Sequence, residues 1–185
     1  MVGHYLTGEH GTSALRTWAV EDAPGNDVAR LLRVRVHDEA GVTRESVDIR
    51  DAVGIEVTFD VLRGGETVAP LLAFRTEWGV HAFTAVDPDP RWRGPAPGRY
   101  VSTAWVPGNL LNETRYGVAV FLTTIMPGKT EKHVSVWDAV AFQTVNSRSE
   151  PSAKGEFLQP WDGAVSPMLE WEVSAVGAGV EVLEP

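Results

Sequence analysis

Tryptophan is the residue type in this sequence that most clearly offers binding chemistry. The chain has seven tryptophans among 185 residues, and an indole ring either fills a hydrophobic core or presents a flat face on which a sugar ring can stack. Trp78 falls at a turn and Trp92 in a proline-rich loop, where burial is harder to achieve, so both are candidate stacking platforms. Trp105 and Trp171 fall in predicted strands, where packing in the core is the commoner outcome.

Motifs for catalysis, phosphate binding or metal binding are not found in the sequence. Residues 127–130 read Pro-Gly-Lys-Thr, like the end of a P-loop, but Thr123 stands where that motif needs its first glycine, so we predict a turn. No Gly-x-Ser-x-Gly pattern occurs. The five histidines form no pair at ligand spacing, cysteine is absent, and Asp87 and Asp89 alternate with prolines, unlike a calcium-binding loop. We therefore predict no catalytic residue, no metal site and no cofactor.

The composition excludes several classes of partner. A formal net charge of −9 and a pI near 5.0 argue against nucleic acid, because phosphates attract a basic surface, and against electrostatic docking on an anionic membrane. Without cysteine there can be no disulfide and no thiolate chemistry, which is compatible with the cytoplasm. No apolar stretch approaches the length of a membrane span, so we predict no direct insertion into a membrane.

Alternation of apolar and polar residues predicts an all-β fold. It is clearest over 55–61, and further strands are predicted at 28–37, 47–49, 71–77, 80–84, 100–106, 115–125, 134–145 and 169–173. The segment 134–145 reads either as a strand pair or as one long bent strand. About eight strands at short spacing, without a convincing helix, predict an immunoglobulin-like or jelly-roll antiparallel β-sandwich.

The stretch 97–122 is the centre of this prediction. It holds two runs rich in β-branched and aromatic residues, joined by Pro-Gly-Asn, and we interpret them as two central antiparallel strands. Glycine and proline interrupt residues 1–27, so we predict a flexible linker there. We predict one sandwich domain over 28–174 and a C-terminal tail over 175–185.

Several short segments follow one another along the chain in an order and at spacings that can be compared with those of known families. They lie at residues 25–31, 38–41, 53–59, 76–83, 97–100 (Pro-Gly-Arg-Tyr), 107–111 (Pro-Gly-Asn-Leu-Leu), 138–145 and 163–171. Together they resemble the C-terminal polysaccharide-binding domain of the ATPase subunit of surface-polysaccharide ABC exporters, the Wzt type. The resemblance covers about residues 20–174 and implies an immunoglobulin-like sandwich that recognises a lipid-linked glycan before export. It also implies a homodimer whose subunits can exchange strands.

The resemblance further implies that residues 1–27 connect to a missing N-terminal ATPase domain. It places the chain in the cytoplasm at the inner face of the cell membrane, with the ATPase domain and the membrane permease of the exporter as partners. Because the sequence carries no P-loop, this chain by itself is not expected to hydrolyse ATP.

We therefore predict a non-catalytic glycan-binding domain. Stacking on aromatic rings and hydrogen bonds from polar side chains would hold the sugar, and the candidate residues are Arg75, Glu77, Trp78, His81, Trp92, Thr103 and Trp105. In the strand at 100–106, Trp105 shares a face with Val101 and Thr103, and this face is either core or the floor of a sugar site. Two alternatives stay open: a glycoside-acting enzyme or its accessory module, which needs two facing carboxylates, and a dimerisation domain without a ligand.

Overall fold

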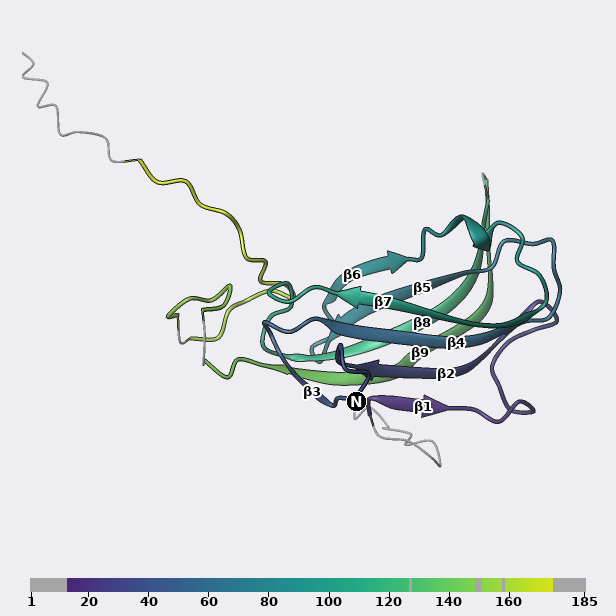
Figure 1. Cartoon of the computed structure of the whole chain (residues 1–185), viewed down its shortest axis with the longest axis horizontal. Coiled ribbons are helices and arrows are strands. Elements are labelled where there is room, and N and C mark those ends of the chain that lie inside the picture. The colour runs from purple at the N-terminus through teal and green to yellow at the C-terminus, as the bar shows by residue number, and fades with distance from the viewer. Residues whose placement is uncertain (1–12, 127, 149–150, 158, 175–185) are drawn as a thin grey trace, which may run out of the picture.

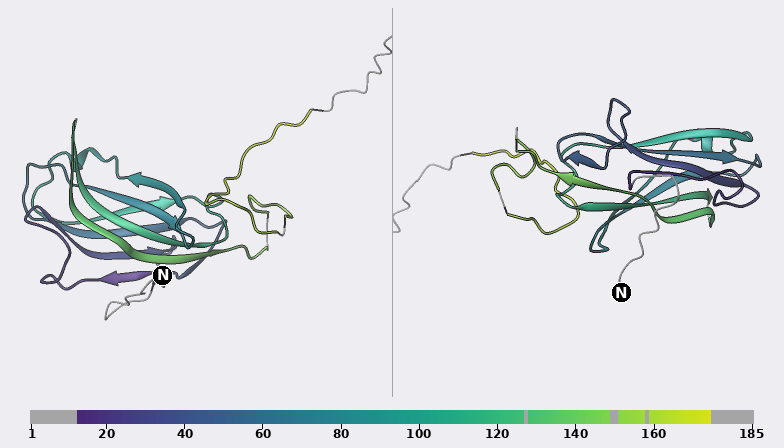
Figure 2. Two further views of the ribbon diagram at one scale, coloured as in Figure 1. Left: turned by 180° about the vertical axis from the view of Figure 1, so that it is seen from behind. Right: turned by 90° about the horizontal axis from the view of Figure 1, so that it is seen from below.

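The computed structural model describes residues 13–126, 128–148, 151–157 and 159–174, and they form a sandwich of two β-sheets (Figures 1 and 2). One sheet has the strand order β1 (Leu15–Thr17), β2 (Ala29–His37), β4 (Val53–Val61), β7 (Gly98–Val106). The other has the order β3 (Ser46–Asp48), β9 (Lys129–Val145), β8 (Arg115–Met126), β5 (Ala69–Thr76), β6 (His81–Val86). All pairs are antiparallel except β3 with β9. The predicted all-β sandwich is confirmed, with nine strands in the described part of the chain.

The alternation of residue types explains how the two sheets face each other. In β4, Ile55, Val57 and Phe59 are fully buried and face the second sheet, while the residues between them face outward. β8 has the same pattern at Tyr116 and Val118, which are fully buried in the core between the layers. One helical turn, η1 (Pro90–Trp92), is the only helix that the described residues contain, and nothing there has the length and apolar character needed to cross a bilayer.

The two strands of the stretch 97–122 lie in different sheets, which corrects the prediction that they pair. β7 is an edge strand that pairs only with β4, whereas β8 lies in the other sheet between β9 and β5. The loop that connects β7 to β8 passes close to Arg50: a Cβ atom on Gly108 would lie 1.9 Å from the Arg50 carbonyl oxygen. The Asn109 amide donates to the Ile49 carbonyl at 2.6 Å, which fixes the loop at this point.

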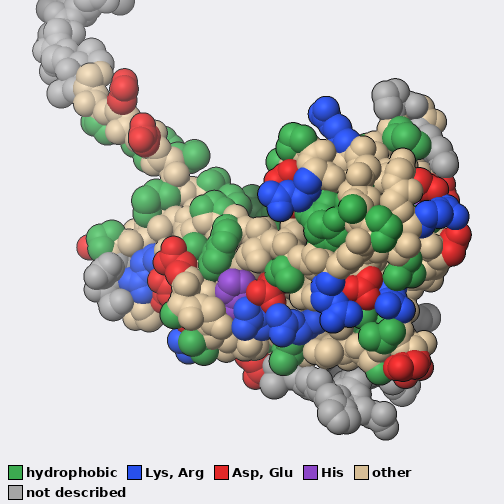
Figure 3. All heavy atoms as spheres, turned by 45° about the vertical axis from the view of Figure 1, so that its right-hand side comes forward, with side chains coloured by type: hydrophobic (Ala, Val, Ile, Leu, Met, Phe, Trp, Pro, Cys, Tyr) green, Lys and Arg blue, Asp and Glu red, His purple; other side chains and the backbone are tan. Residues whose placement is uncertain are grey.

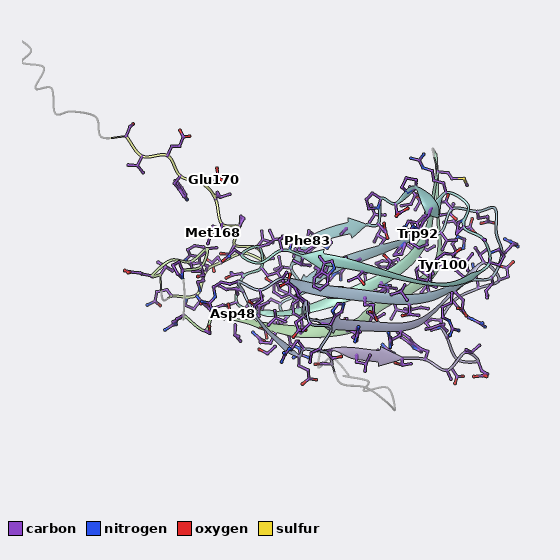
Figure 4. The ribbon with its side chains drawn as sticks, in the orientation of Figure 1. Asp48, Phe83, Trp92, Tyr100, Met168 and Glu170 are labelled. Carbon is purple, nitrogen blue, oxygen red and sulfur yellow. The ribbon has the colours of Figure 1, made fainter. Side chains whose placement is uncertain are left out.

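The ends of the sandwich also differ from the prediction. β1 lies inside the segment predicted as a linker and pairs with β2, so sheet structure begins before residue 28. Residues 169–173 were predicted as a strand, but they form none, because no neighbouring strand pairs with them. The chain leaves the sandwich after Met168, whose amide donates to the Asn109 carbonyl at 3.0 Å, and extends outward through Glu170 (Figure 4).

Tyr116 connects the core to the segment that precedes this extension. Its fully buried hydroxyl donates to the Ala164 carbonyl at 2.7 Å and accepts from the Asn112 amide at 2.9 Å. Burial raises the pKa of Tyr116 to about 12, although the hydrogen bond from Asn112 acts in the opposite direction. The hydroxyl therefore holds its proton more tightly in the folded chain than in the unfolded chain.

This pKa predicts a loss of stability in alkali. The unfolded tyrosine loses its proton near pH 10 and the folded one near pH 12, so the unfolded chain binds fewer protons between these values and stability falls as pH rises. We expect the free energy of unfolding to lose about 3 kcal/mol over this range through Tyr116, and Tyr116→Phe to remove that part of the loss. Urea unfolding at several pH values checks it, with Tyr100→Phe as the control; an unchanged alkaline slope in Tyr116→Phe would contradict it.

Candidate functional site

A cluster of apolar and basic side chains lies on the outer face of the five-stranded sheet. We call it the outer-face cluster and define it as Leu71, Ala73, Arg75, Ala119, Phe121, Lys132 and Trp137. Strands β5, β8 and β9 supply its members, and Leu71 lies directly opposite Phe121 in the register of β5 and β8. Because directly opposite residues project to the same face of a sheet, the register brings these side chains together.

Trp137 is the open aromatic surface of this cluster. Its ring meets that of Phe121 edge-on, with the ring centroids 5.2 Å apart at 86°, and 51% of the residue is exposed. The strand that carries it is irregular here: one residue of β8, between Val118 and Val120, faces three residues of β9, between Val136 and Val140. A bulge of this kind redirects side chains. Trp137 therefore presents a flat, partly open ring on a strand rather than on a loop.

Two cations border the ring of Trp137. The guanidinium carbon of Arg75 lies 4.8 Å from the ring centroid, and the Lys132 Nζ lies 5.8 Å from it and 4.6 Å from the centroid of Phe121. Gly117 lies opposite Arg75 in β8, so β8 places no side chain between this arginine and β9. An aromatic face beside N–H donors is the arrangement that a sugar ring needs, because sugars have apolar faces and hydroxyl edges.

Four of the predicted site residues come from one β-hairpin beside this cluster. Arg75 lies opposite His81 in the register of β5 and β6, and Glu77 and Trp78 lie in the turn between the strands. Gly79 closes this turn with a φ of 78°, which confirms the predicted hairpin. Trp78 is 73% exposed at its tip.

The hairpin side chains have few partners within the protein. The Glu77 carboxylate accepts from the Thr114 hydroxyl at 3.2 Å, and the His81 Nε2 lies 3.1 Å from the Thr84 hydroxyl. Arg75, Glu77, Trp78 and His81 are thus brought to one end of the five-stranded sheet, where all four are exposed.

Trp92 was predicted as an exposed platform, and the structure shows that it is a core residue. Only 3% of it is exposed, and its ring centroid lies 5.5 Å from those of Phe59 and Tyr100. Asp89 caps the single turn η1 by accepting from the Arg91 amide, and this turn directs Trp92 inward. Figure 4 shows Trp92 and Tyr100 close together at the end of the sandwich opposite the C-terminal segment.

Thr103 and Trp105 lie on the other sheet, so the seven predicted residues do not form one site. In β7, Ser102, Ala104 and Val106 face the core, and Thr103 and Trp105 face outward, which decides the question left open by the sequence. Trp105 is 48% exposed and meets His37 edge-on at 5.1 Å. Gly54 lies between their strands, where a Cβ atom would come within 2.8 Å of the histidine ring.

The rest of this outer face is a network of ion pairs. Arg30 and Arg99 both bind the Asp60 carboxylate, at 2.9 Å and 2.8 Å. Hydrogen bonds from Arg99 and then Arg30 hold the pKa of Asp60 below its ordinary value, although burial acts in the opposite direction. Arg33 and Arg35 bind Glu56 in the same way. Figure 3 shows basic and acidic side chains side by side in a band across the molecule.

Sequence reasoning missed Trp137, Phe121 and Lys132 as site residues. A signal was present, because alternation around Val134 and Val136 assigns Trp137 to the opposite, outward face of its strand. That signal does not show which strands lie beside β9, and the cluster exists only because β8 and β5 do.

Comparison with known proteins identifies the fold. No protein-family model matches the chain, and a search of curated proteins found no relative. Among solved structures, the chain is similar to the crystal structure of the C-terminal domain of Wzt, with a TM-score of 0.61 and 12% sequence identity over 82% of this chain and 86% of that chain. The resemblance found in the sequence is therefore confirmed as a shared fold, that of the C-terminal domain of Wzt.

Proposed function

We propose that the protein is a non-catalytic carbohydrate-binding domain and that the outer-face cluster is its binding site. The observation that carries the proposal is Trp137, a half-exposed ring held on a strand between Arg75 and Lys132. Stacking on the ring would bind the apolar face of a sugar, while the neighbouring donors would bind its hydroxyl groups. Such a site binds weakly, since each sugar hydroxyl exchanges water for a protein partner at little net gain.

The shared fold supports a more specific proposal. We infer that the glycan is a cell-surface polysaccharide that an ABC transporter exports, as the resemblance to the Wzt type implies. The domain would act in the cytoplasm at the inner face of the membrane, together with an ATPase domain and the membrane permease. Recognition there would deliver the correct polymer to the transporter without any chemistry at the binding site.

The protonation state of two carboxylates on β4, Glu56 and Asp60, argues against glycoside hydrolysis on the four-stranded sheet. A glycosidase needs one carboxyl group that keeps its proton near neutral pH in order to protonate the leaving group. Burial acts to raise the pKa of Glu56, but hydrogen bonds from Arg35 and Arg33 outweigh burial, so this pKa is lowered. The pKa of Asp60 is lowered as well. These two carboxylates are ionised partners of arginines and are poor proton donors.

The test of the proposed function is a titration with the polysaccharide of the host cell. Oligosaccharides prepared from it are titrated into the full chain at concentrations up to the millimolar range, and heat or amide chemical shifts are followed. We expect saturable binding, with the largest shifts on β5, β8 and β9. Absence of binding at millimolar sugar would count against the proposal, and turnover of the oligosaccharide would establish the enzyme alternative.

The exposed C-terminal segment supports a homodimer as part of this proposal. Leu169 and Trp171 are 61% and 84% exposed, and the segment alternates apolar and acidic residues without a strand partner. Pairing of this segment with a sheet edge of a second copy would bury them. We expect light scattering to give a dimer mass for the full chain and a monomer mass for a chain that ends at Pro167; equal masses would contradict this pairing. A dimer would also add a second site and so strengthen weak binding to a repeating polymer.

A further inference from the structure

We propose, building on the proposed function, that the outer-face cluster selects glycans that carry a negative charge, a carboxylate or phosphate group on the sugar. The two cations that border Trp137 are the basis for this inference. Nothing in the described part of the chain gives either cation a carboxylate partner, and both lie within 5.8 Å of the centroid of the Trp137 ring.

The contrast with eight other arginines makes this arrangement informative. Eight arginines of the described residues form ion pairs with carboxylates: Arg30, Arg33, Arg35, Arg44, Arg50, Arg63, Arg91 and Arg99. In a chain with a net charge of −9, acidic groups are in excess and an exposed arginine readily finds one. Arg75 and Lys132 instead contact aromatic rings, which leaves their N–H groups free for a ligand.

The geometry of Arg75 suits an anionic group in particular. A guanidinium that lies over an aromatic ring keeps its N–H edge free, and this edge can donate two parallel hydrogen bonds to a carboxylate or phosphate. Contact with Trp137 also fixes its position before the ligand arrives, so little side-chain entropy is lost on binding. Lys132 lies over the adjoining Phe121 and adds a second charge beside the same ring.

Two carboxylates lie near the cluster and limit the net charge of the site: Glu77, two residues after Arg75, and Asp138. Asp138 follows Trp137, and its Oδ1 lies 3.8 Å from the position that a Cβ atom on Gly117 would take. Among the described residues, neither carboxylate forms an ion pair with Arg75 or Lys132, and the Glu77 carboxylate instead accepts from the Thr114 hydroxyl at 3.2 Å. The two cations of the cluster therefore keep their charges unpaired by these carboxylates, which favours one anionic substituent per sugar-binding event.

The test compares one oligosaccharide with and without its charges. A linear oligogalacturonate and its fully methyl-esterified form are titrated into the full chain at about 0.05 M and 0.5 M salt, together with a phosphorylated sugar to separate phosphate from carboxylate. We expect the acid form to bind at least tenfold more tightly than the ester at low salt. The ratio should shrink at high salt, because the Debye length falls below about 10 Å above 0.1 M.

Two variants test whether the outer-face cluster causes the preference for the acid form. The double variant Arg75→Gln with Lys132→Gln should bring the ratio of the acid and ester affinities to about one. Arg93→Gln removes one positive charge from an exposed loop next to η1 and should leave the ratio unchanged. Thermal unfolding of each variant checks that the fold is retained.

The possible outcomes separate this inference from the proposed function. If acid and ester bind equally, or if the double variant keeps the full ratio, the charge selection is wrong and the proposed glycan-binding function stands. The same holds if only a neutral oligosaccharide of the host binds. If no oligosaccharide of any kind binds, both proposals fail.

Discussion

Replacement of Trp137 by alanine is expected to weaken glycan binding at least tenfold while the protein remains folded. Trp137 offers the open ring of the outer-face cluster, and loss of a central aromatic residue from a binding site costs about 2 kcal/mol or more. A change of 1.4 kcal/mol corresponds to a factor of ten in Kd. The fold should tolerate the change, because half of Trp137 already contacts solvent and it is not part of the core between the two sheets.

Titration of the host oligosaccharide into both forms measures the effect, and two further variants interpret it. Trp137→Phe keeps a smaller stacking face and should retain part of the affinity. Trp105→Ala removes an equally exposed tryptophan from the outer face of the other sheet and should leave binding unchanged. The opposite result, with binding lost in Trp105→Ala and kept in Trp137→Ala, would move the site to the four-stranded sheet.

Replacement of Trp92 by alanine is expected to have the largest effect on stability. Trp92 is buried between Phe59 and Tyr100 at the end of the sandwich, and removal of a buried tryptophan leaves a cavity that costs about 3–5 kcal/mol. A domain of this size is stable by about 5–15 kcal/mol, so this one change removes a large part of its stability. Urea unfolding measures the shift in the midpoint at unchanged slope.

Two further measurements, the stability of Trp92→Phe and the glycan affinity of Trp92→Ala, test the core position of Trp92. Trp92→Phe should cost less than the alanine variant, because it keeps a ring in the cavity and removes the Trp92 Nε1, which is buried without a hydrogen-bond partner in the described part of the protein. The fraction of Trp92→Ala that remains folded should bind glycan with normal affinity. If Trp92→Ala had normal stability but did not bind glycan, Trp92 would be a residue of the binding site.

The sequence predicted the strands well because alternation reports a property of a single segment. In β4, every second residue from Ile55 to Val61 is buried, and the pattern can be read without knowing the neighbouring strand. The positions of β7 and β8 depended on which strands are neighbours, and nothing in either segment specifies its sheet. For the same reason residues 169–173 have the pattern of a strand and yet form none, since alternation shows a capacity for pairing and does not supply a partner.

The candidate site was predicted only in part, for two physical reasons. The four hairpin residues Arg75, Glu77, Trp78 and His81 are local to one another, so a turn signal was enough to bring them together. Alternation assigns Trp137 to the outward face of its strand, but Trp137 reaches Arg75 across a third strand, and no residue pattern specifies which strands are neighbours. Trp92 was misassigned because a single turn of helix in a proline-rich loop was sufficient to bury it.

The parallel pairing of β3 with β9 has a consequence for folding kinetics. The Ser147 amide donates to Asp48, 99 positions away in the chain, and the Arg16 side chain donates to the Asp138 carbonyl, 122 positions away. Closing a loop of this length lowers the entropy of the chain before any contact stabilises it. Folding rates therefore fall as the sequence separation of contacting residues grows. During synthesis, β3 is complete long before its strand partner β9 has been made, so β3 cannot pair until the last strand is available. We therefore expect folding to be slow for a chain of this size, with β9 completing the sandwich in a late step.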